Sequence, residues 1–194
     1  MKKTLINLAQ GFVWESQARN RYTMFASKAR KESFLQISNI FLETAEQEKE
    51  HAEWFMKMFL AVKEKEWLDM ETLPVETEVF VKLGTTLENL GYTIAGETHE
   101  FEDMYAQFAK DALEEWYPEV AARINAISNA EKHHAERYQK LYDQLKNETL
   151  RNKSEEVEWI CSKCGHTHKG KNPPKICPSC GHEEEYFIVK CENY

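Results

Sequence analysis

The strongest constraint on how this chain folds is a pair of polar residues, Glu48 and His51, within the apolar face of a long helical segment. Steps of three and four residues from Glu48 reach a mostly apolar series, which predicts a buried helix face. The series is Ile37, Phe41, Thr44, Ala45, Ala52, Phe55, Phe59 and Val62. Because burying an unpaired carboxylate is costly, Glu48 must either carry a proton or lie beside a cation.

The same periodicity predicts four long helices joined by two short turns and one long crossover. Their ranges are 4–31, 33–64, 85–115 and 118–147. The start signals are Thr4 as an N-cap, Ser33 with Gln36 and Thr85 with Glu88 as capping boxes, and Pro118 as a first helical residue. The crossover, residues 65–84, lacks a long helical period, and we expect a short turn or strand at residues 79–81.

Each half of the chain carries the same polar pattern. Glu15 lies 33 residues before Glu48, and Glu97 lies 34 residues before Glu131, which begins a second Glu-x-x-His motif ending at His134. Each half is thus a helical hairpin that offers one glutamate from its first helix and Glu-x-x-His from its second. Two hairpins of one design joined by a crossover predict a four-helix bundle with a pseudo-twofold axis.

The third helix is predicted to carry a further inward glutamate, Glu100, one turn after Glu97. Its expected inner face is Leu87, Leu90, Thr93, Ile94, Glu97, Glu100, Phe101, Met104 and Phe108. The bundle would then bring five carboxylates toward one core, which is unstable without cations. Two Fe(II) ions would leave a residual charge of about −1, and an oxygen-rich site with one imidazole per metal favours iron or manganese. His99 and His133 are expected to lie off these faces.

All five cysteines lie after residue 160, and four of them form two Cys-x-x-Cys pairs. The pairs are Cys161 with Cys164 and Cys177 with Cys180. In a reducing compartment this spacing predicts a tetrathiolate metal site rather than disulfides, and the glycine after each second cysteine allows the backbone to turn around a metal. Zinc and iron are both compatible with the spacing, and a redox bundle on the same chain favours iron.

The predicted division is a four-helix bundle over residues 1–147, a linker over 148–156 and a four-cysteine domain over 157–194. No apolar run reaches the ~18 residues of a membrane span, and the basic first residues do not lead into a secretory signal, so we expect no membrane association and a cytoplasmic location. The net charge of −8 argues against nucleic acid as a partner.

Taken together, these motifs resemble rubrerythrin over essentially the whole chain. The matching segments are residues 15–22, 43–51, 95–100 and 131–134, followed by the four-cysteine domain. The resemblance implies a mainly α fold, in which a ferritin-like four-helix bundle with a long crossover precedes a small β/loop rubredoxin-like domain.

The resemblance implies a non-haem di-iron peroxidase that protects against oxidative stress. It would reduce hydrogen peroxide to water with electrons passed from NAD(P)H, through a reductase or rubredoxin, to the iron of the rubredoxin-like domain. Family members form homodimers or larger homo-oligomers. The ligands implied for the two irons are Glu15, Glu48, Glu97, Glu100, Glu131 and His134, with Glu48 and Glu131 as bridges.

The resemblance implies that three further residues, His51, Tyr22 and Tyr105, take part in catalysis. On reduction, one iron is expected to exchange the ligand Glu100 for His51. Tyr22 and Tyr105 resemble tyrosines that lie beside the iron ligands. Two features differ from the family pattern. Trp14 is bulkier than expected directly before a ligand and would reshape access to the site, and His166 stands where rubredoxins usually carry tyrosine.

Two other functions are compatible with the sequence. A ferritin-like ferroxidase or iron-handling protein would use the same bundle, favour O2 over peroxide and need its four cysteines only as a structural zinc ribbon. A metal-binding adaptor would use the zinc ribbon to contact a protein partner, and the purified protein would then be colourless and redox-silent.

Overall fold

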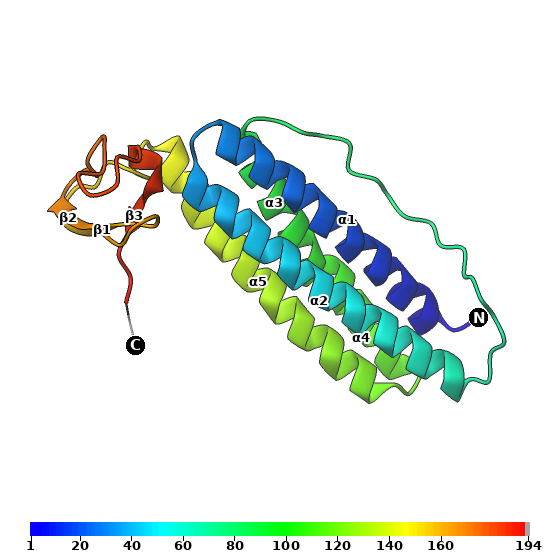
Figure 1. The fold of residues 1–194 in the computed structure, drawn as a ribbon. Coiled ribbons are helices and arrows are strands. Elements are labelled where there is room, and N and C mark those ends of the chain that lie inside the picture. Colours follow the sequence, from blue (N-terminus) through cyan, green and yellow to red (C-terminus); the bar gives the residue numbers. More distant parts are fainter. Residues whose placement is uncertain (193–194) are drawn as a thin grey trace.

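The structure, a computed structural model, describes residues 1–192 as a helical bundle with a small sheet domain beyond one end (Figure 1). One hairpin consists of α1 and α2, and the other consists of α3, α4 and α5. Their bounds are Lys3–Lys31 for α1, Leu35–Lys65 for α2, Thr86–His99 for α3, Tyr105–Glu114 for α4 and Pro118–Lys146 for α5. The predicted α fold with a long crossover between the hairpins is confirmed.

A polar layer divides the core of the bundle into two apolar clusters. One cluster contains Leu8, Phe55, Phe108 and Ile124, and the other is built around an aromatic group in which the rings of Phe41 and Tyr138 stack at 5.0 Å. Burying each large apolar side chain contributes about 1.5–3 kcal/mol. The two clusters therefore hold the four helices on both sides of the polar layer and fix its geometry.

Two of the predicted helix starts are wrong. α1 begins at Lys3, and Thr4 donates its backbone N–H and its hydroxyl to the Glu115 carboxylate of the other hairpin, at 2.9 and 2.7 Å. Ser33 does not cap α2, because it closes the tight turn after α1 with a φ of 62°, and Phe34 takes the N-cap position without a side-chain hydrogen bond. The capping box of Thr85 with Glu88 and the position of Pro118 are confirmed.

The two hairpins cap each other's first helix. Glu115, directly after α4, accepts hydrogen bonds from the first turn of α1, and Glu32, directly after α1, accepts them from Thr86 N and Oγ1 at the start of α3. A carboxylate at a helix N-terminus satisfies free N–H groups and interacts favourably with the helix dipole. The reciprocal pair gives the predicted pseudo-twofold relation a concrete structural basis.

The third predicted helix contains a π-helical turn, η1 (Glu100–Met104), between α3 and α4. A π turn holds one extra residue, so every side chain after it is displaced around the helix axis. For this reason the inner face predicted beyond Glu100 is partly wrong. Phe101 and Met104 are only half-buried, whereas Tyr105, one position later, is completely buried.

The crossover runs in extended form along α1 (Figure 1), and residues 68–84 contain no helix or strand. The prediction of a short turn or strand at residues 79–81 is therefore wrong. Two side chains of α1 hold the segment by donating to its backbone carbonyls, Gln10 to Glu76 O at 3.0 Å and Gln17 to Glu78 O at 3.2 Å. These side-chain hydrogen bonds take the place of a sheet or helix partner.

The small domain is a three-stranded antiparallel sheet in the order β2-β1-β3. The bounds are Val157–Cys161 for β1, Thr167–Gly170 for β2, Phe187–Val189 for β3 and Glu184–Tyr186 for the 3-10 turn η2. Its core consists of Trp159 and Phe187 with two of the cysteines, and the Trp159 indole donates to Gly170 O at 2.9 Å. So small a core needs a metal or another cross-link to stay folded.

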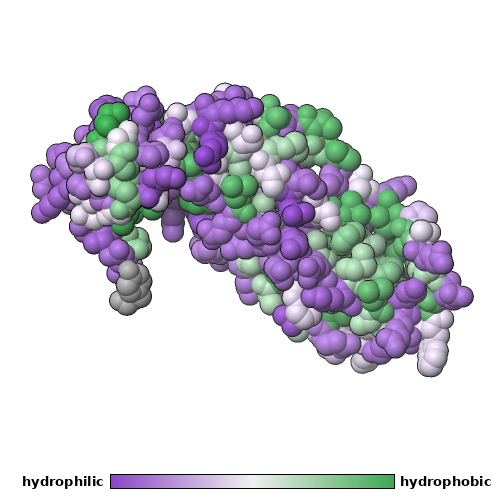
Figure 2. All heavy atoms as spheres, in the orientation of Figure 1, coloured by the Kyte–Doolittle hydropathy of each residue, from purple (hydrophilic) through white to green (hydrophobic). Residues whose placement is uncertain are grey.

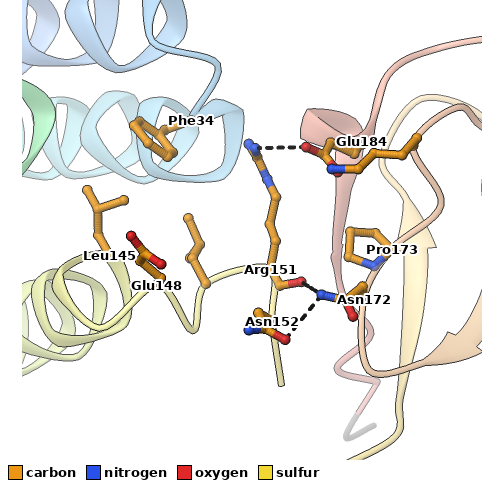
Figure 3. Close-up of a pocket in the computed structure, with 10 residues that line it drawn as sticks. Phe34, Leu145, Glu148, Arg151, Asn152, Asn172, Pro173 and Glu184 are labelled. Atoms are coloured by element: carbon orange, nitrogen blue, oxygen red, sulfur yellow. Dashed lines mark hydrogen bonds and ion pairs between the residues drawn. The ribbon is translucent and has the colours of Figure 1, made fainter. Parts of the chain in front are cut away.

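Arg151 connects the linker to both domains (Figure 3). Its guanidinium donates to the backbone carbonyl of Ser33, lies 5.6 Å from the ring of Phe34 and lies 3.9 Å from the Glu184 carboxylate. The backbone carbonyl of Arg151 accepts from Asn172 at 2.9 Å. This one residue therefore ties the α1–α2 turn to the small domain.

The surface of the bundle is mixed in polarity. Figure 2 shows apolar side chains gathered over the N-terminal half of α1 and the C-terminal half of α2, where a hollow beside the crossover is lined by Phe12, Val13, Phe59 and Leu60. Among the helices of residues 1–192, none combines the length and the apolar character that crossing a membrane requires.

The observed helix caps predict different effects for two similar substitutions. Thr85→Ala should lower the free energy of unfolding by about 1 kcal/mol, because it removes an N-cap hydrogen bond. Ser33→Ala should change it by less than about 0.5 kcal/mol, because that side chain caps no helix. Urea unfolding followed by helical circular dichroism measures both, and an equal loss in the two variants would contradict the assignment of the caps.

Candidate metal centre

The polar layer of the bundle gathers side chains from four helices. Glu15 comes from α1, Glu48 and His51 from α2, Glu97 from α3, and Glu131 and His134 from α5. All four of these glutamates are completely buried, His134 is 3% exposed and the His51 side chain is 13% exposed. They are buried because the three-to-four residue period of each helix places them on the face that packs into the bundle.

Glu48 and Glu131 each span the space between the two histidines. The Nδ1 atom of His51 lies 2.9 Å from Glu48 Oε2 and 2.8 Å from Glu131 Oε1. The Nδ1 atom of His134 lies 3.3 Å from Glu48 Oε1 and 2.8 Å from Glu131 Oε2. Each carboxylate thus turns one oxygen to each imidazole, which is the arrangement of a bridging ligand between two metal ions.

One further glutamate completes each half of the centre. Glu15 joins His51 and the two shared carboxylates in a first cluster, and Glu97 joins His134 and the same carboxylates in a second. Within each cluster the potential ligand atoms all lie within 4.8 Å of one another. The structure therefore brings together both Glu-x-x-His motifs and both preceding glutamates, as two four-residue clusters that share two members.

Two tyrosines cross the pseudo-twofold axis to the glutamates of the other hairpin. The Tyr22 hydroxyl donates to Glu97 Oε1, and the Tyr105 hydroxyl donates to Glu15 Oε1. Tyr22 follows Glu15 by seven residues, whereas Tyr105 follows Glu97 by eight. The π turn holds the extra residue, and it also accounts for the spacings of 33 and 34 residues between the paired glutamates.

Glu100, the first residue of the π turn, is buried but belongs to neither cluster. Its Oε1 atom accepts a hydrogen bond from the Trp14 indole N–H. The ligand role expected for Glu100 therefore remains a prediction. His99 and His133 are exposed and lie outside both clusters, as expected.

Sequence reasoning assigned no role to Gln47, although it belongs to the same motif as Glu48. Its Oε1 atom lies 3.0 Å from His134 Nε2. Because an amide oxygen only accepts, this contact fixes one ring proton on Nε2, so Nδ1, which faces the carboxylates, carries the second proton of the imidazolium in the metal-free protein and could bind a metal once that proton is lost. The only sequence signal was the position of Gln47 beside Glu48 on the helix that faces α5.

The carboxylates of the centre respond differently to burial. Burial, reinforced by neighbouring carboxylates, raises the pKa of Glu15 and Glu100 well above the usual range and that of Glu97 to about 8. Burial also opposes ionisation of Glu48, but hydrogen bonds with His134 and His51 outweigh it and lower the pKa of Glu48 to about 2. Glu48 thus stays charged at neutral pH while its neighbours compete for protons.

The histidines supply positive charge to the centre when no metal does. Burial disfavours the imidazolium form, but hydrogen bonds and charge from Glu131 and Glu48 outweigh it. The pKa of His51 is raised to about 10 and that of His134 to about 12. Protonated histidines are therefore the charge-neutralising alternative to bound cations.

Hydrogen bonds alone do not satisfy the carboxylate and imidazole atoms of the two clusters, whereas bound metal ions would. Within the described residues, the buried atoms that make no hydrogen bond of good geometry include Glu15 Oε2, Glu48 Oε1, Glu97 Oε2, both Glu131 oxygens and His134 Nδ1, although the imidazoles lie within ion-pair distance of several of these oxygens. Buried polar atoms normally have partners, so a cluster of atoms without them at one point indicates a missing cation. Carboxylates with one imidazole per metal are the donors that iron and manganese take in helical bundles.

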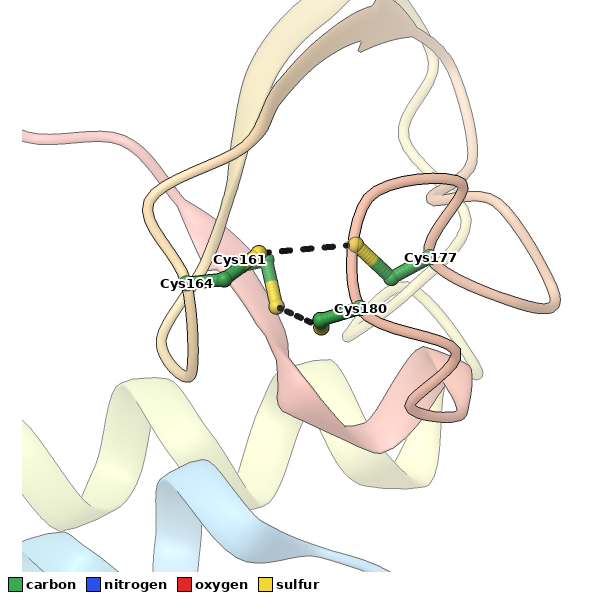
Figure 4. Close-up of side chains that lie close together, drawn as sticks. All are labelled: Cys161, Cys164, Cys177 and Cys180. Atoms are coloured by element: carbon green, nitrogen blue, oxygen red, sulfur yellow. Dashed lines mark hydrogen bonds between the residues drawn. The ribbon is translucent and has the colours of Figure 1, made fainter.

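The four cysteines form a second candidate metal site (Figure 4). Their sulfur atoms lie within 4.8 Å of one another, with Cys161 and Cys180 at 3.8 Å and Cys164 and Cys177 at 3.7 Å. A disulfide would need about 2.05 Å, whereas a tetrahedron with metal–sulfur bonds of about 2.3 Å has edges of about 3.8 Å. The predicted tetrathiolate arrangement is present.

Two knuckles of the same geometry carry these cysteines. Gly165 and Gly181 have φ angles of 76° and 74°, the conformation that favours glycine. Their N–H groups donate to Cys161 O at 2.8 Å and to Cys177 O at 2.9 Å. The expectation that a glycine turns the backbone after each second cysteine is confirmed.

Comparison with known proteins gives the same assignment for both parts of the chain. The rubrerythrin family matches residues 7–142, and the rubredoxin-like domain of rubrerythrin matches residues 159–188. A putative rubrerythrin of Methanocaldococcus jannaschii is 47% identical over 100% of this chain and 96% of its own length. Rubrerythrin-1 of Clostridium acetobutylicum is 44% identical over 99% of this chain and 96% of its own length.

Solved structures agree with this assignment. Partially reduced nigerythrin has a TM-score of 0.62 and 27% identity, covering 96% of this chain and 86% of its own. The bacterioferritin of Desulfovibrio desulfuricans, with a TM-score of 0.64 and 21% identity over 75% of this chain and 81% of its own, shows that the bundle has the ferritin-like fold. The carboxylate–histidine clusters and the four-cysteine site fit the iron cofactors of rubrerythrins. By sequence, fold and both metal-ligand sets, this chain belongs to the rubrerythrin family.

Proposed function

We propose that this protein is a non-haem di-iron peroxidase that reduces hydrogen peroxide to water and protects against oxidative stress. The observation that carries the proposal is the pair of carboxylate–histidine clusters that share Glu48 and Glu131. A tetrathiolate site on the same chain supports it, because such a site, loaded with iron, is a one-electron carrier.

The residues assigned to one metal are Glu15 and His51, and those assigned to the other are Glu97 and His134, with Glu48 and Glu131 shared. A reduced iron pair supplies the two electrons that cleavage of the peroxide O–O bond requires. The protein supplies the fixed ligand geometry and the exclusion of bulk water, since these carboxylates are completely buried.

Reduction of peroxide to two water molecules also consumes two protons, and the structure suggests a source on each side of the centre. The Tyr105 hydroxyl donates to Glu15 and the Tyr22 hydroxyl to Glu97. Burial keeps both phenols protonated by raising their pKa well above the usual range. Each tyrosine thus holds a proton at a ligand oxygen, where it can support proton delivery.

His51 and Glu100 are proposed to be exchangeable ligands. His51 lies in the first cluster and is the most exposed of the clustered side chains, while the buried Glu100 lies beside the clusters on the π turn. π turns are frequent at functional sites, where they place an additional side chain. An added carboxylate ligand would suit the more highly charged oxidised irons, and a neutral imidazole would suit the reduced ones.

Electrons are proposed to come from an NAD(P)H-dependent reductase, directly or through rubredoxin, to iron in the tetrathiolate site. We further propose a cytoplasmic homodimer or larger homo-oligomer. The apolar hollow over α1 and α2 is consistent with subunit contact, because large exposed apolar areas commonly mark interfaces.

The function is tested by anaerobic iron loading of the full chain, followed by absorption spectra and peroxide consumption with NADH, a rubredoxin reductase and rubredoxin. We expect rapid peroxide loss with reoxidation of both iron sites. Cys177→Ser should retain the bundle irons and lose reductase-driven turnover. Faster reoxidation by O2 than by peroxide, with turnover unaffected in Cys177→Ser, would instead support a ferroxidase with a structural zinc ribbon.

Variants separate a fixed bridging ligand from an exchangeable one. Glu48→Ala should abolish the di-iron site, because it removes a ligand from both metals at once. His51→Ala should retain most of the iron and slow peroxide turnover by roughly tenfold or more. Iron analysis and stopped-flow kinetics measure these effects, with the exposed Glu50→Ala on the same helix as control. Peroxide rates equal to wild type in His51→Ala would contradict ligand exchange.

Metal binding should release protons and depend on pH. In the metal-free protein both histidines are charged at pH 7.5, because their pKa values are raised to about 10 and about 12. Two bound divalent ions should therefore displace about two protons or more, and affinity should rise with pH throughout the range from 6 to 9, because both histidines are still protonated there in the metal-free protein. Calorimetric titration with Zn(II) in buffers of different ionisation enthalpy counts these protons, once the four-cysteine site has been filled with one equivalent of Zn(II). His51→Ala should release fewer protons and the exposed His133→Ala the same number as wild type, whereas buffer-independent heats would refute the assignment.

A further inference from the structure

We propose that Trp14 is a positioning residue that holds the Glu100 carboxylate away from the metal centre through its indole N–H. The inference rests on the proposed function only in taking Glu100 as a potential ligand. Trp14 directly precedes Glu15 on α1, and its N–H donates to Glu100 Oε1 on the π turn of the other hairpin. The hydrogen bond occupies the carboxylate that would otherwise be available to the nearer metal.

The indole itself is held in a fixed orientation. The Arg21 guanidinium, about two turns further along the same face of α1, lies 5.9 Å from the Trp14 ring, and the His99 ring meets it edge-on at 6.1 Å. Arg21 also lies 5.4 Å from the ring of Phe80 in the crossover. Contacts from Arg21 and His99, the former held in turn by Phe80 of the crossover, thus restrict Trp14 to a position from which its N–H reaches Glu100.

Trp14 also stands between Glu100 and the solvent. A surface hollow between α1, the crossover and the π-turn helix is lined by Gln10, Trp14, Glu76, Glu78, His99 and Phe108. Trp14 is half-buried and forms a wall of this hollow, whereas Glu100 on its inner side is 1% exposed. The Trp14 indole therefore gives the buried Glu100 carboxylate an uncharged hydrogen-bond donor. It also excludes the water that could otherwise donate to Glu100.

This role of Trp14 requires that Glu100 on the π turn can take a second position, turned toward the metal. Its backbone lacks the regular α-helical bonding, and Ser128 Oγ of α5 lies 3.5 Å from the Phe101 carbonyl. A local backbone of this kind can shift more easily than a continuous α-helix. The Glu100 carboxylate can then either accept the Trp14 hydrogen bond or turn to the metal. Its Oε1 atom cannot do both at once. Removing the N–H should shift this equilibrium toward the metal by roughly tenfold or more.

The experiment uses the full chain loaded with Zn(II), a divalent and redox-inactive probe. In the wild type, nuclear magnetic resonance should show one indole N–H that is displaced downfield and protected from exchange. Trp14→Phe identifies that resonance by its loss. Glu100→Gln should move it, and the exposed Trp116→Phe should not. A Trp14 indole resonance that Glu100→Gln leaves unchanged, or a crystal structure with Glu100 on Zn(II) in the wild type, would overturn the proposal.

A second measurement distinguishes positioning from a merely structural role. With iron loaded, Trp14→Phe should lower the reduction potential of the bundle site, because the freed carboxylate stabilises the oxidised metals. In the Glu100→Gln background the same substitution should have no effect on that potential. A shift of equal size in both backgrounds would overturn the proposal. The Zn(II) results do not depend on peroxide chemistry, so a protein without peroxidase activity could still show the Trp14–Glu100 hydrogen bond, and the two failures are distinguishable.

Discussion

The rest of the structure depends on the mutual repulsion of carboxylates buried in one layer of the bundle. Completely buried Glu15, Glu48, Glu97 and Glu131 can coexist only with protons, imidazolium groups or metal ions among them. The apolar clusters on either side hold these groups at short range and prevent them from separating into water. Folding energy from the two clusters is thus what maintains an electrostatically unfavourable layer, and metal binding relieves the conflict. This explains why a helix face can carry glutamate where sequence periodicity demands an apolar residue.

The two metal-ligand sets solve different physical problems. In the bundle, two large apolar clusters stabilise the fold without a metal, although the buried carboxylates between them are unfavourable. The bundle can therefore hold these ligands in a defined geometry. In the small domain, Trp159 and Phe187 provide little apolar burial, and two of the four cysteines, Cys161 and Cys177, form part of the core themselves. The bundle can therefore shape its metal site, whereas the small domain needs a metal or another cross-link to stay folded. The contacts of Arg151 with the α1–α2 turn and with Glu184 show how the linker joins units with such different sources of stability.

Sequence reasoning identified the groups whose positions follow from helical period and repetition. Glu15, Glu48, Glu97 and Glu131 fall on inward faces because a regular helix places them there, and the cysteine spacing alone brings four sulfur atoms together. It failed where a tertiary contact replaced a local one. Thr4 met Glu115 across the bundle instead of capping α1, and the hydrogen bond between Trp14 and Glu100 joins residues far apart in the chain. The one sequence sign of the π turn is that Glu97 and Glu131 are 34 residues apart, whereas Glu15 and Glu48 are 33 apart; a strict repeat would have equal spacings.

The π turn makes the two halves of a duplicated fold chemically different. Two identical hairpins would create two identical half-sites, and neither metal would have a reason to behave differently from the other. A single additional residue in the second hairpin introduces Glu100 at its first position and realigns everything that follows, so Tyr105 still matches Tyr22. One insertion can thus make the two metal sites of a symmetric bundle different, while the matching tyrosine–glutamate contacts of the two hairpins are kept. A designed bundle made by repeating one hairpin would need a comparable insertion, or an unequal substitution such as that of Ala18 and Glu100 here, before its two metals could take unequal roles.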